Sequence, residues 1–136
     1  MIGRTKTGAL LLIVLFTSSC NFLPSPRKVD WKAVWKDNES SLKQFAVKVS
    51  ADTTRYRNHG QYDFPSNFEY PFDEGFVVER RKNDVTLAFY TDRGLLDHYS
   101  AFIYTTDSTM RSELDEKVKM GGNDHFLEKN WYLIND

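Results

Sequence analysis

The sequence predicts an α+β domain, in which one main helix packs on a four- to five-stranded antiparallel sheet, after a cleaved N-terminal signal peptide. Two periodicities predict the domain: apolar residues recur with a helical period within 38–56 and with a period of two within 76–134. A helix with one apolar stripe and a sheet with one apolar face can cover each other, which gives a single layered core. The first twenty residues differ in composition and are typical of an export leader.

The main helix is expected over residues 38–56. Asn38, Ser40 or Ser41 can supply the N-cap oxygen at its start. Trp31 and Trp35 precede this segment, and we expect them to close the core from its N-terminal side, with a position at a membrane interface as the alternative. The apolar face of the helix consists of residues spaced i, i+3, i+4 and i+7, namely Leu42, Phe45, Ala46 and Val49.

The segment that follows residue 75 is expected to supply the sheet. Strands at 76–81, 85–90 and 95–105 are joined by short turns into an antiparallel meander. A polar helix is expected over 107–120, capped by Asp107 or Ser108, and its charged residues are interpreted as a solvated face. After a turn at 121–124, residues 125–134 are expected to form one closing strand that pairs within the sheet.

The segment 57–75 combines prolines with several aromatic residues. Pro65 and Pro71 favour an edge strand or an ordered loop over a central strand. One hypothesis is an aromatic platform for a sugar or a peptide, which requires the rings to converge with a polar group in one concave pocket. The alternative is a loop that its rings pin to the core. The candidate ligand-binding residues are Tyr62, Phe64, Phe68, Tyr70 and Phe72.

The N-terminal stretch has the three parts of a secretory signal peptide. Arg4 and Lys6 give a basic start, an apolar run covers residues 9–16, and small polar residues follow at 17–19. The apolar run is much shorter than the roughly 20 residues of a membrane-spanning helix, so we expect a cleaved leader rather than a permanent span. A buried helix of a cytosolic domain is the alternative, but such a helix would not need the basic start.

Cys20 follows this leader directly and is the only cysteine in the chain. A lone cysteine in an exported protein indicates a modification, an intermolecular bridge or a free thiol. The segment 16–20, FTSSC, resembles the lipobox of bacterial lipoproteins. The resemblance implies that the Cys20 thiol receives a diacylglyceryl group, that the leader is cut just before it, and that the new amino terminus is acylated. Cleavage nearby by an ordinary signal peptidase is the alternative.

The resemblance implies that the membrane is a partner, reached through the lipid anchor. One acyl chain such as palmitate binds only marginally, so the several chains of the family would give firm attachment. In enteric lipoproteins an aspartate after the cysteine tends to mean inner-membrane retention, and Asn21 here favours the outer membrane. We therefore expect a signal peptide at 1–19, the lipidated cysteine with a proline-containing tether at 20–28, and a single α+β domain at 29–136.

Charge and motifs argue against several function classes. The net charge is −1, and −3 once residues 1–19 with their two cations and no acid are removed, so no basic stripe for nucleic acid is expected. His59, His98 and His125 belong to no metal-ligand motif, and no metal or cofactor is expected. We predict a non-enzymatic envelope lipoprotein that binds an envelope protein or supports an assembly, with the oligomeric state left open. The alternatives are the aromatic ligand site and a hydrolase, which would need a histidine beside a carboxylate in a cleft.

Overall fold

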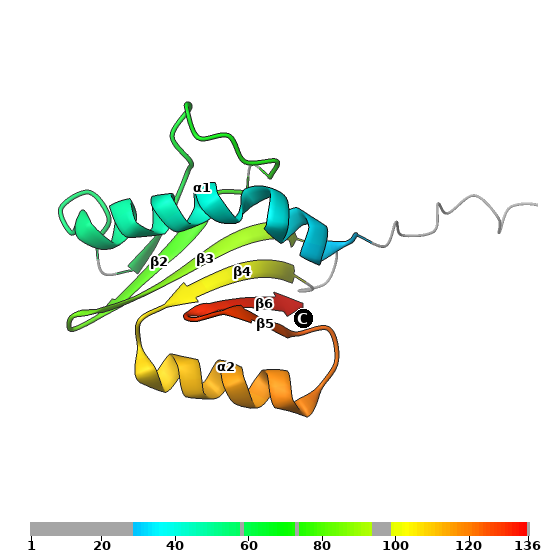
Figure 1. Ribbon diagram of the computed structural model, residues 1–136. Helices are drawn as coiled ribbons and strands as arrows, with labels where there is room; N and C mark the ends of the chain where they lie inside the picture. The colour runs from blue at the N-terminus through cyan, green and yellow to red at the C-terminus, as the bar shows by residue number, and fades with distance from the viewer. Residues whose placement is uncertain (1–28, 58, 73, 94–98, 136) are drawn as a thin grey trace, which may run out of the picture. The chain divides into compact units, whose positions relative to one another are not determined.

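The computed structural model describes residues 29–57, 59–72, 74–93 and 99–135 (Figure 1). The chain divides into two compact units, Met1–Asp30 and Trp31–Asp136, and the described helices and strands belong to the second. Cys20, the expected signal peptide and the expected tether lie outside the described residues. The elements in chain order are α1 (Trp31–Ala51), β1 (His59–Tyr62), β2 (Phe76–Arg81), β3 (Asp84–Arg93), β4 (Tyr99–Thr105), α2 (Ser108–Met120), β5 (His125–Glu128) and β6 (Trp131–Asn135).

The described elements confirm the α+β class and the antiparallel sheet. The sheet has six strands in the order β1-β2-β3-β4-β6-β5, and each neighbouring pair is antiparallel. The prediction of four or five strands was therefore too low. β1 forms because Pro65 and Pro71 lie beyond its last residue and do not interrupt its pairing with β2. The predicted closing strand is divided into β5 and β6 by a turn in which Asn130 has a φ of 70°.

Helix α1 begins at Trp31, earlier than the predicted start at Asn38. The predicted N-cap at Asn38, Ser40 or Ser41 was wrong, since all three lie inside the helix. Asn38 Nδ2 instead donates to the backbone carbonyl of Val34, one turn earlier, at 2.8 Å. Residues 31–37 contain neither proline nor glycine, so nothing local stops the helix from extending through them.

The larger core lies between α1 and one face of the sheet. Phe45 is at its centre, with ring centroids 5.0 Å from Phe76 and 4.5 Å from Phe68. Trp35 is buried as expected, 5.0 Å from the ring of Trp131. The buried residues of this cluster are Trp35, Leu42, Phe45, Ala46, Val49, Tyr56, Phe76, Val78, Val85, Leu87, Phe89, Phe102, Trp131 and Leu133.

Arg80 of β2 joins the sheet to the end of α1. Its guanidinium donates from Nε to the carbonyl of Tyr56 at 3.0 Å, and from Nη1 and Nη2 to the carbonyls of Ser50 and Val49 at 3.1 and 2.6 Å. The last carbonyls of a helix have no partner within the helix. Arg80 supplies that partner, and so determines where the C-terminal turn of α1 meets β2.

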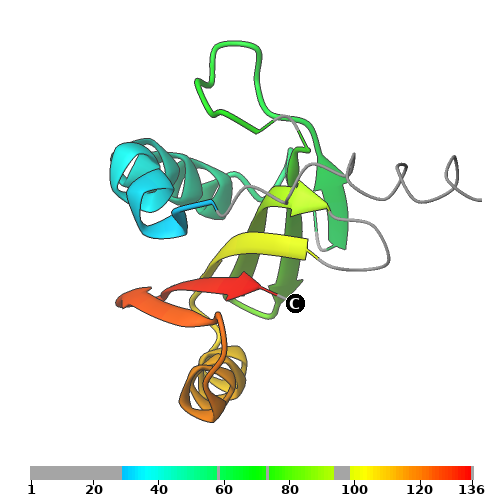
Figure 2. The same cartoon turned by 90° about the vertical axis from the view of Figure 1, so that its right-hand side faces the viewer.

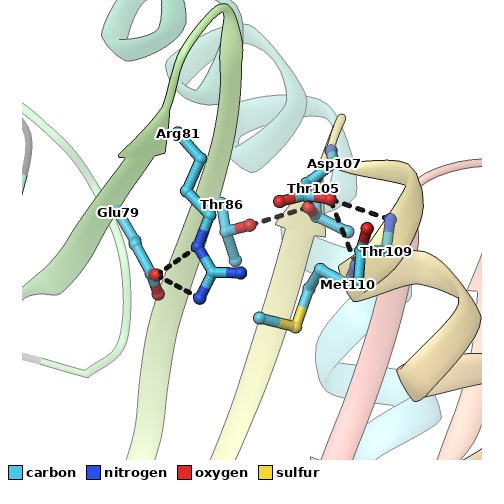
Figure 3. Close-up of polar contacts among 7 residues, drawn as sticks. All are labelled: Glu79, Arg81, Thr86, Thr105, Asp107, Thr109 and Met110. Carbon is cyan, nitrogen blue, oxygen red and sulfur yellow. Dashed lines mark hydrogen bonds and ion pairs between the residues drawn. The ribbon is translucent and has the colours of Figure 1, made fainter.

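Helix α2 packs on the opposite face, near the β5 and β6 end of the sheet (Figures 1 and 2). Asp107 caps it, because its Oδ1 accepts from the backbone N–H groups of Thr109 and Met110 at 2.8 and 3.3 Å (Figure 3). This confirms the predicted cap. The second core is small, with Leu114, Tyr132 and Ile134 buried and with Tyr99, Ile103, Met110 and Val118 packed around them.

Candidate functional site

One candidate site is a hollow of about 370 Å³ between α2 and the β5–β6 hairpin, here named the α2 hollow. The helix contributes Ser108, Arg111, Ser112 and Asp115. These residues are spaced i, i+3, i+4 and i+7 and therefore share one helix face, distinct from the face that buries Leu114. The hairpin contributes Phe126, Lys129, Asn130 and Tyr132.

The Arg111 guanidinium is held by few protein contacts. Its Nη1 donates to Asn130 Oδ1 at 3.3 Å, which is slightly longer than the usual range for an N–H···O hydrogen bond. Its Nε is buried and has no hydrogen-bond partner. A buried donor without a partner costs about 1–3 kcal/mol, and more on a charged group. Arg111 is therefore a cation with unused hydrogen-bonding capacity in the wall of the hollow.

Asp115 of α2 and Tyr132 of β6 form a hydrogen-bonded pair in the lining of the hollow. The Tyr132 hydroxyl donates to Asp115 Oδ1 at 2.8 Å. Burial, and then the hydrogen bond and charge of Asp115, raise the pKa of Tyr132 to about 12. The hydroxyl thus stays protonated at neutral pH and directs one carboxylate oxygen of Asp115 toward itself. With Arg111 and Lys129, the hollow has one more positive than negative charge among its lining residues.

Phe126 forms an apolar part of the same wall. It belongs to the edge strand β5, and 55% of its surface is exposed. Its ring meets the ring of Tyr132 edge-to-face, with 5.6 Å between the centroids. The α2 hollow therefore combines cations, hydroxyl groups and an aromatic surface, a composition that is common in small ligand sites.

A second hollow of about 300 Å³, here named the loop hollow, lies between the C-terminal half of α1 and the segment that follows β1. Lys48, Asp52 and Arg55 give it charged groups, and Asn67 gives it an amide. Its apolar lining consists of Phe45, Tyr56, Pro65 and Phe68. Of the five predicted ligand-binding aromatic residues, Phe68 is the one that lines this hollow.

The predicted aromatic residues come together as a half-buried group on the α1 side of the sheet. Tyr62, Phe64, Phe68 and Tyr70 pack against the larger core, and Phe72 contacts Trp31 and Tyr70 with ring centroids 6.1 and 5.4 Å apart. The Tyr70 hydroxyl is buried without a hydrogen-bond partner, and burial raises the pKa of Tyr70. Much of the ring surface is thus in contact with other rings, and binding by this group remains a prediction.

Gly75 closes the same segment just before β2. Its φ is 74°, and a Cβ at this position would collide with the backbone carbonyl oxygen of Tyr62. This position requires glycine, since any other residue would be strained at this φ and would have no space for its Cβ. Gly75 therefore brings the end of the segment back onto the end of β1.

Neither of the two described histidines, His59 and His125, lines one of the hollows. His59 is exposed on β1, opposite Glu79 in the register, and the Glu79 carboxylate pairs with Arg81 at 2.9 Å (Figure 3). His125 is on β5, and His98 lies outside the described residues. Within the described ranges no three His, Cys, Asp or Glu side chains are grouped so that they could hold a metal ion. In the same part of the chain, neither helix has the length and apolarity needed to cross a membrane.

Sequence reasoning missed the α2 hollow. The charges of residues 107–117 were interpreted as one solvated face, whereas Arg111 and Asp115 face the hairpin and Lys119 pairs with Glu116 in solvent. The helical spacing of Ser108, Arg111, Ser112 and Asp115 was a usable signal. No local sequence signal indicated that the β5–β6 hairpin would contribute to the hollow, because that contribution depends on which strands become neighbours.

Comparison with known proteins gives no family and no relative from which a function could be inferred. No protein-family model, no curated protein and no solved structure matches the chain.

Proposed function

We propose that the protein is a lipid-anchored, non-enzymatic binding module of the bacterial cell envelope. The observation that carries the proposal is the leader that ends in FTSSC, with Cys20 as the only cysteine of the chain. Acyl chains on Cys20 would hold the domain at a membrane, with the outer membrane favoured by Asn21. A residue in this position acts as an anchor, and the domain that follows it presents its surface to partners in the envelope.

The surface of the domain supports binding as the activity. The two hollows offer cations, hydroxyl groups, amides and aromatic rings. Neither His59 nor His125 lines them, so the described residues offer no histidine beside a carboxylate there for acid–base catalysis. One oxygen of the Asp115 carboxylate, Oδ1, accepts a hydrogen bond from the hydroxyl of Tyr132, whose pKa is raised to about 12. These groups suit recognition through hydrogen bonds and charge.

The anchor is tested by intact mass measurement on membrane fractions of cells that produce the wild-type chain or Cys20→Ala. The wild-type protein is expected to begin at Cys20, to carry the mass of acyl chains and to remain with the membranes. Cys20→Ala should lose both the added mass and the membrane attachment. An unacylated, soluble wild-type protein cut near residue 20 would contradict the proposal.

Asn21→Asp provides a matched control for the same experiment. It should keep the acyl mass on Cys20, because the modified thiol and the residues before it are unchanged. In an enteric host it should move the protein from the outer toward the inner membrane. A protein that loses its acyl chains on this substitution would show that residue 21 affects processing rather than sorting.

A second candidate function is the binding of a small ligand at the loop hollow. It is favoured by the composition of the lining, to which Phe68 contributes an aromatic residue, Asn67 an amide residue and Lys48 a cation. Chitobiose is a suitable probe, because its acetamido groups and sugar faces match an amide and an aromatic ring. Titration should shift the backbone amide resonances of Asn67 and Phe68, and Asn67→Ala should abolish the shifts. Unchanged resonances at these two residues in the wild type would exclude chitobiose from this hollow.

A further inference from the structure

We propose that the α2 hollow binds a carboxylate that carries an adjacent apolar group, as the C-terminal end of a peptide does. Arg111 and Lys129 would hold the carboxylate, and Phe126 with Tyr132 would contact the apolar group. This deepens the proposed binding function, on which it rests, by naming the site and the chemical class of the ligand. It makes no use of the lipid on Cys20, so the two proposals can fail independently.

Charge selects a monoanion. Arg111 and Lys129 each contribute one positive charge to the lining, and Asp115 contributes one negative charge. A phosphate monoester carries close to two negative charges at neutral pH. Its second charge would lie beside Asp115 without a compensating cation. A carboxylate, with a single charge, matches the surplus of one positive charge in the hollow.

Arg111 has the geometry and the free donors to receive a carboxylate. A guanidinium has five N–H donors in a planar fork that fits the two oxygens of a carboxylate. Arg111 uses one of them, in the 3.3 Å contact to Asn130, and its Nε has no partner. The Nε is buried, so a carboxylate is received once the guanidinium turns its Nε and Nη2 edge toward the hollow, where a bidentate pair of charge-assisted hydrogen bonds can form.

The apolar half of the site is beside the cations. Phe126 is 55% exposed and already contacts Tyr132, so its open face continues the wall of the hollow. An apolar group attached to the bound carboxylate would cover this face and remove it from water. On the helix side, the exposed hydroxyls of Ser108 and Ser112 can donate to the second carboxylate oxygen.

The test is a titration of the purified full-length protein, followed by ¹H–¹⁵N NMR. The probes are 3-phenylpropionate, the tripeptide Gly-Gly-Phe, the uncharged amides of both, and inorganic phosphate. The two acids are expected to shift the Arg111 Nε–H resonance and the backbone amides of Phe126, Lys129 and Asn130. The amides should bind at least about tenfold more weakly, since they lack the charge that the guanidinium recognises.

The probes also distinguish the source of the carboxylate. Tighter binding of Gly-Gly-Phe than of 3-phenylpropionate would assign the site to a peptide C-terminus, and the reverse order would assign it to a free small acid. Both results support the proposal. Tighter binding of phosphate than of either acid, equal binding of acids and amides, or no shift at these residues with any probe would overturn it.

Variants connect the effect to Arg111. Arg111→Lys keeps the charge but removes the fork, and it should weaken both acids by about tenfold or more. Arg81→Lys makes the same exchange at an exposed arginine outside the hollow and should leave the affinity unchanged. Unaltered spectra away from the hollow show that each variant is folded. Unchanged affinity in folded Arg111→Lys would refute the assignment.

Binding and anchoring are separated by repeating the titration on Cys20→Ala. The affinity for the acids should be the same in this variant, because all of the residues proposed to bind the acids are unchanged. If Cys20→Ala loses the acyl mass and still binds the acids, the lipid anchor and the carboxylate site are independent of each other. If the wild-type protein is acylated normally but does not bind the acids, the proposed carboxylate site is refuted and the proposed lipid anchor is not affected.

Discussion

The two faces of the sheet differ in how completely they are packed. On one face, the 21 residues of α1 cover a cluster of aromatic and aliphatic side chains whose buried strand residues come from β2, β3, β4 and β6. On the other face, the 13 residues of α2 bury Leu114, Tyr132 and Ile134 and leave the α2 hollow beside them. The first arrangement provides stability, and the second leaves polar side chains available to a ligand.

Two arginines show the same difference at atomic scale. Arg80 donates to three backbone carbonyls at 2.6 to 3.1 Å, and its position is determined by the end of α1. Arg111 makes one hydrogen bond of 3.3 Å and has a buried Nε without a partner. The two residues are of the same type, and their surroundings give them different roles. Arg80 meets the unpaired carbonyls at the end of a helix, whereas Arg111 lies between the side of a helix and a hairpin, where few acceptors are available.

The largest expected effect concerns the two cores. Phe45→Ala should lower the free energy of unfolding by about 3–5 kcal/mol, because it leaves a cavity among buried rings that cannot all collapse into it. Leu114→Ala should cost about 2 kcal/mol, since the smaller cluster can adjust more easily. Urea unfolding measures both values. Val47→Ala, at an exposed position of α1, should stay within about 0.5 kcal/mol, and a larger loss for Leu114 than for Phe45 would reverse the comparison.

The two arginines give a smaller difference. Arg80→Met should destabilise the protein by about 2–3 kcal/mol, because three carbonyls lose a charged donor. Arg111→Met should change stability by less than about 1 kcal/mol, since it removes one long hydrogen bond together with a donor that has no partner. The same unfolding experiment compares them. Equal losses for the two variants would show that Arg111 is as structural as Arg80.

The smallest effect concerns the hydroxyl of Tyr132. Its pKa is about 12 in the folded protein, above the ordinary value of 10, so folding favours the protonated form. The resulting stabilisation is complete below pH 10 and is lost as the pH rises toward 12. Tyr132→Phe should cost about 1 kcal/mol at neutral pH through the lost hydrogen bond to Asp115. Stability measured from pH 8 to 12 should fall less steeply in this variant than in the wild type.

Tyr70→Phe is the matched control at neutral pH. The Tyr70 hydroxyl is buried without a hydrogen-bond partner, so its removal should leave stability unchanged or slightly higher. A loss as large as that of Tyr132→Phe would mean that the Tyr70 hydroxyl does have a partner in solution. Such a result would also change the description of the aromatic segment.

Local patterns predicted much of the fold. The alternation of Val85, Leu87 and Phe89 placed one face of β3 correctly, because a strand turns successive side chains to opposite sides. The cap at Asp107 was predicted because an N-cap is determined by the residue and its next few neighbours. The predicted start of α1 was wrong. Asn38 was interpreted as the N-cap because asparagine is a common capping residue, whereas the helix begins at Trp31 and continues through Asn38.

By itself, the sequence determined the α+β class, the central meander, the apolar faces of the helices and the expectation of a lipid anchor at Cys20. Each of these depends on residues close together in the chain. Only the tertiary structure decided that β6 lies between β4 and β5, which brings the turn at Asn130 against the polar face of α2. The α2 hollow exists because of this order, and strand order depends on long-range pairing that no local pattern contains.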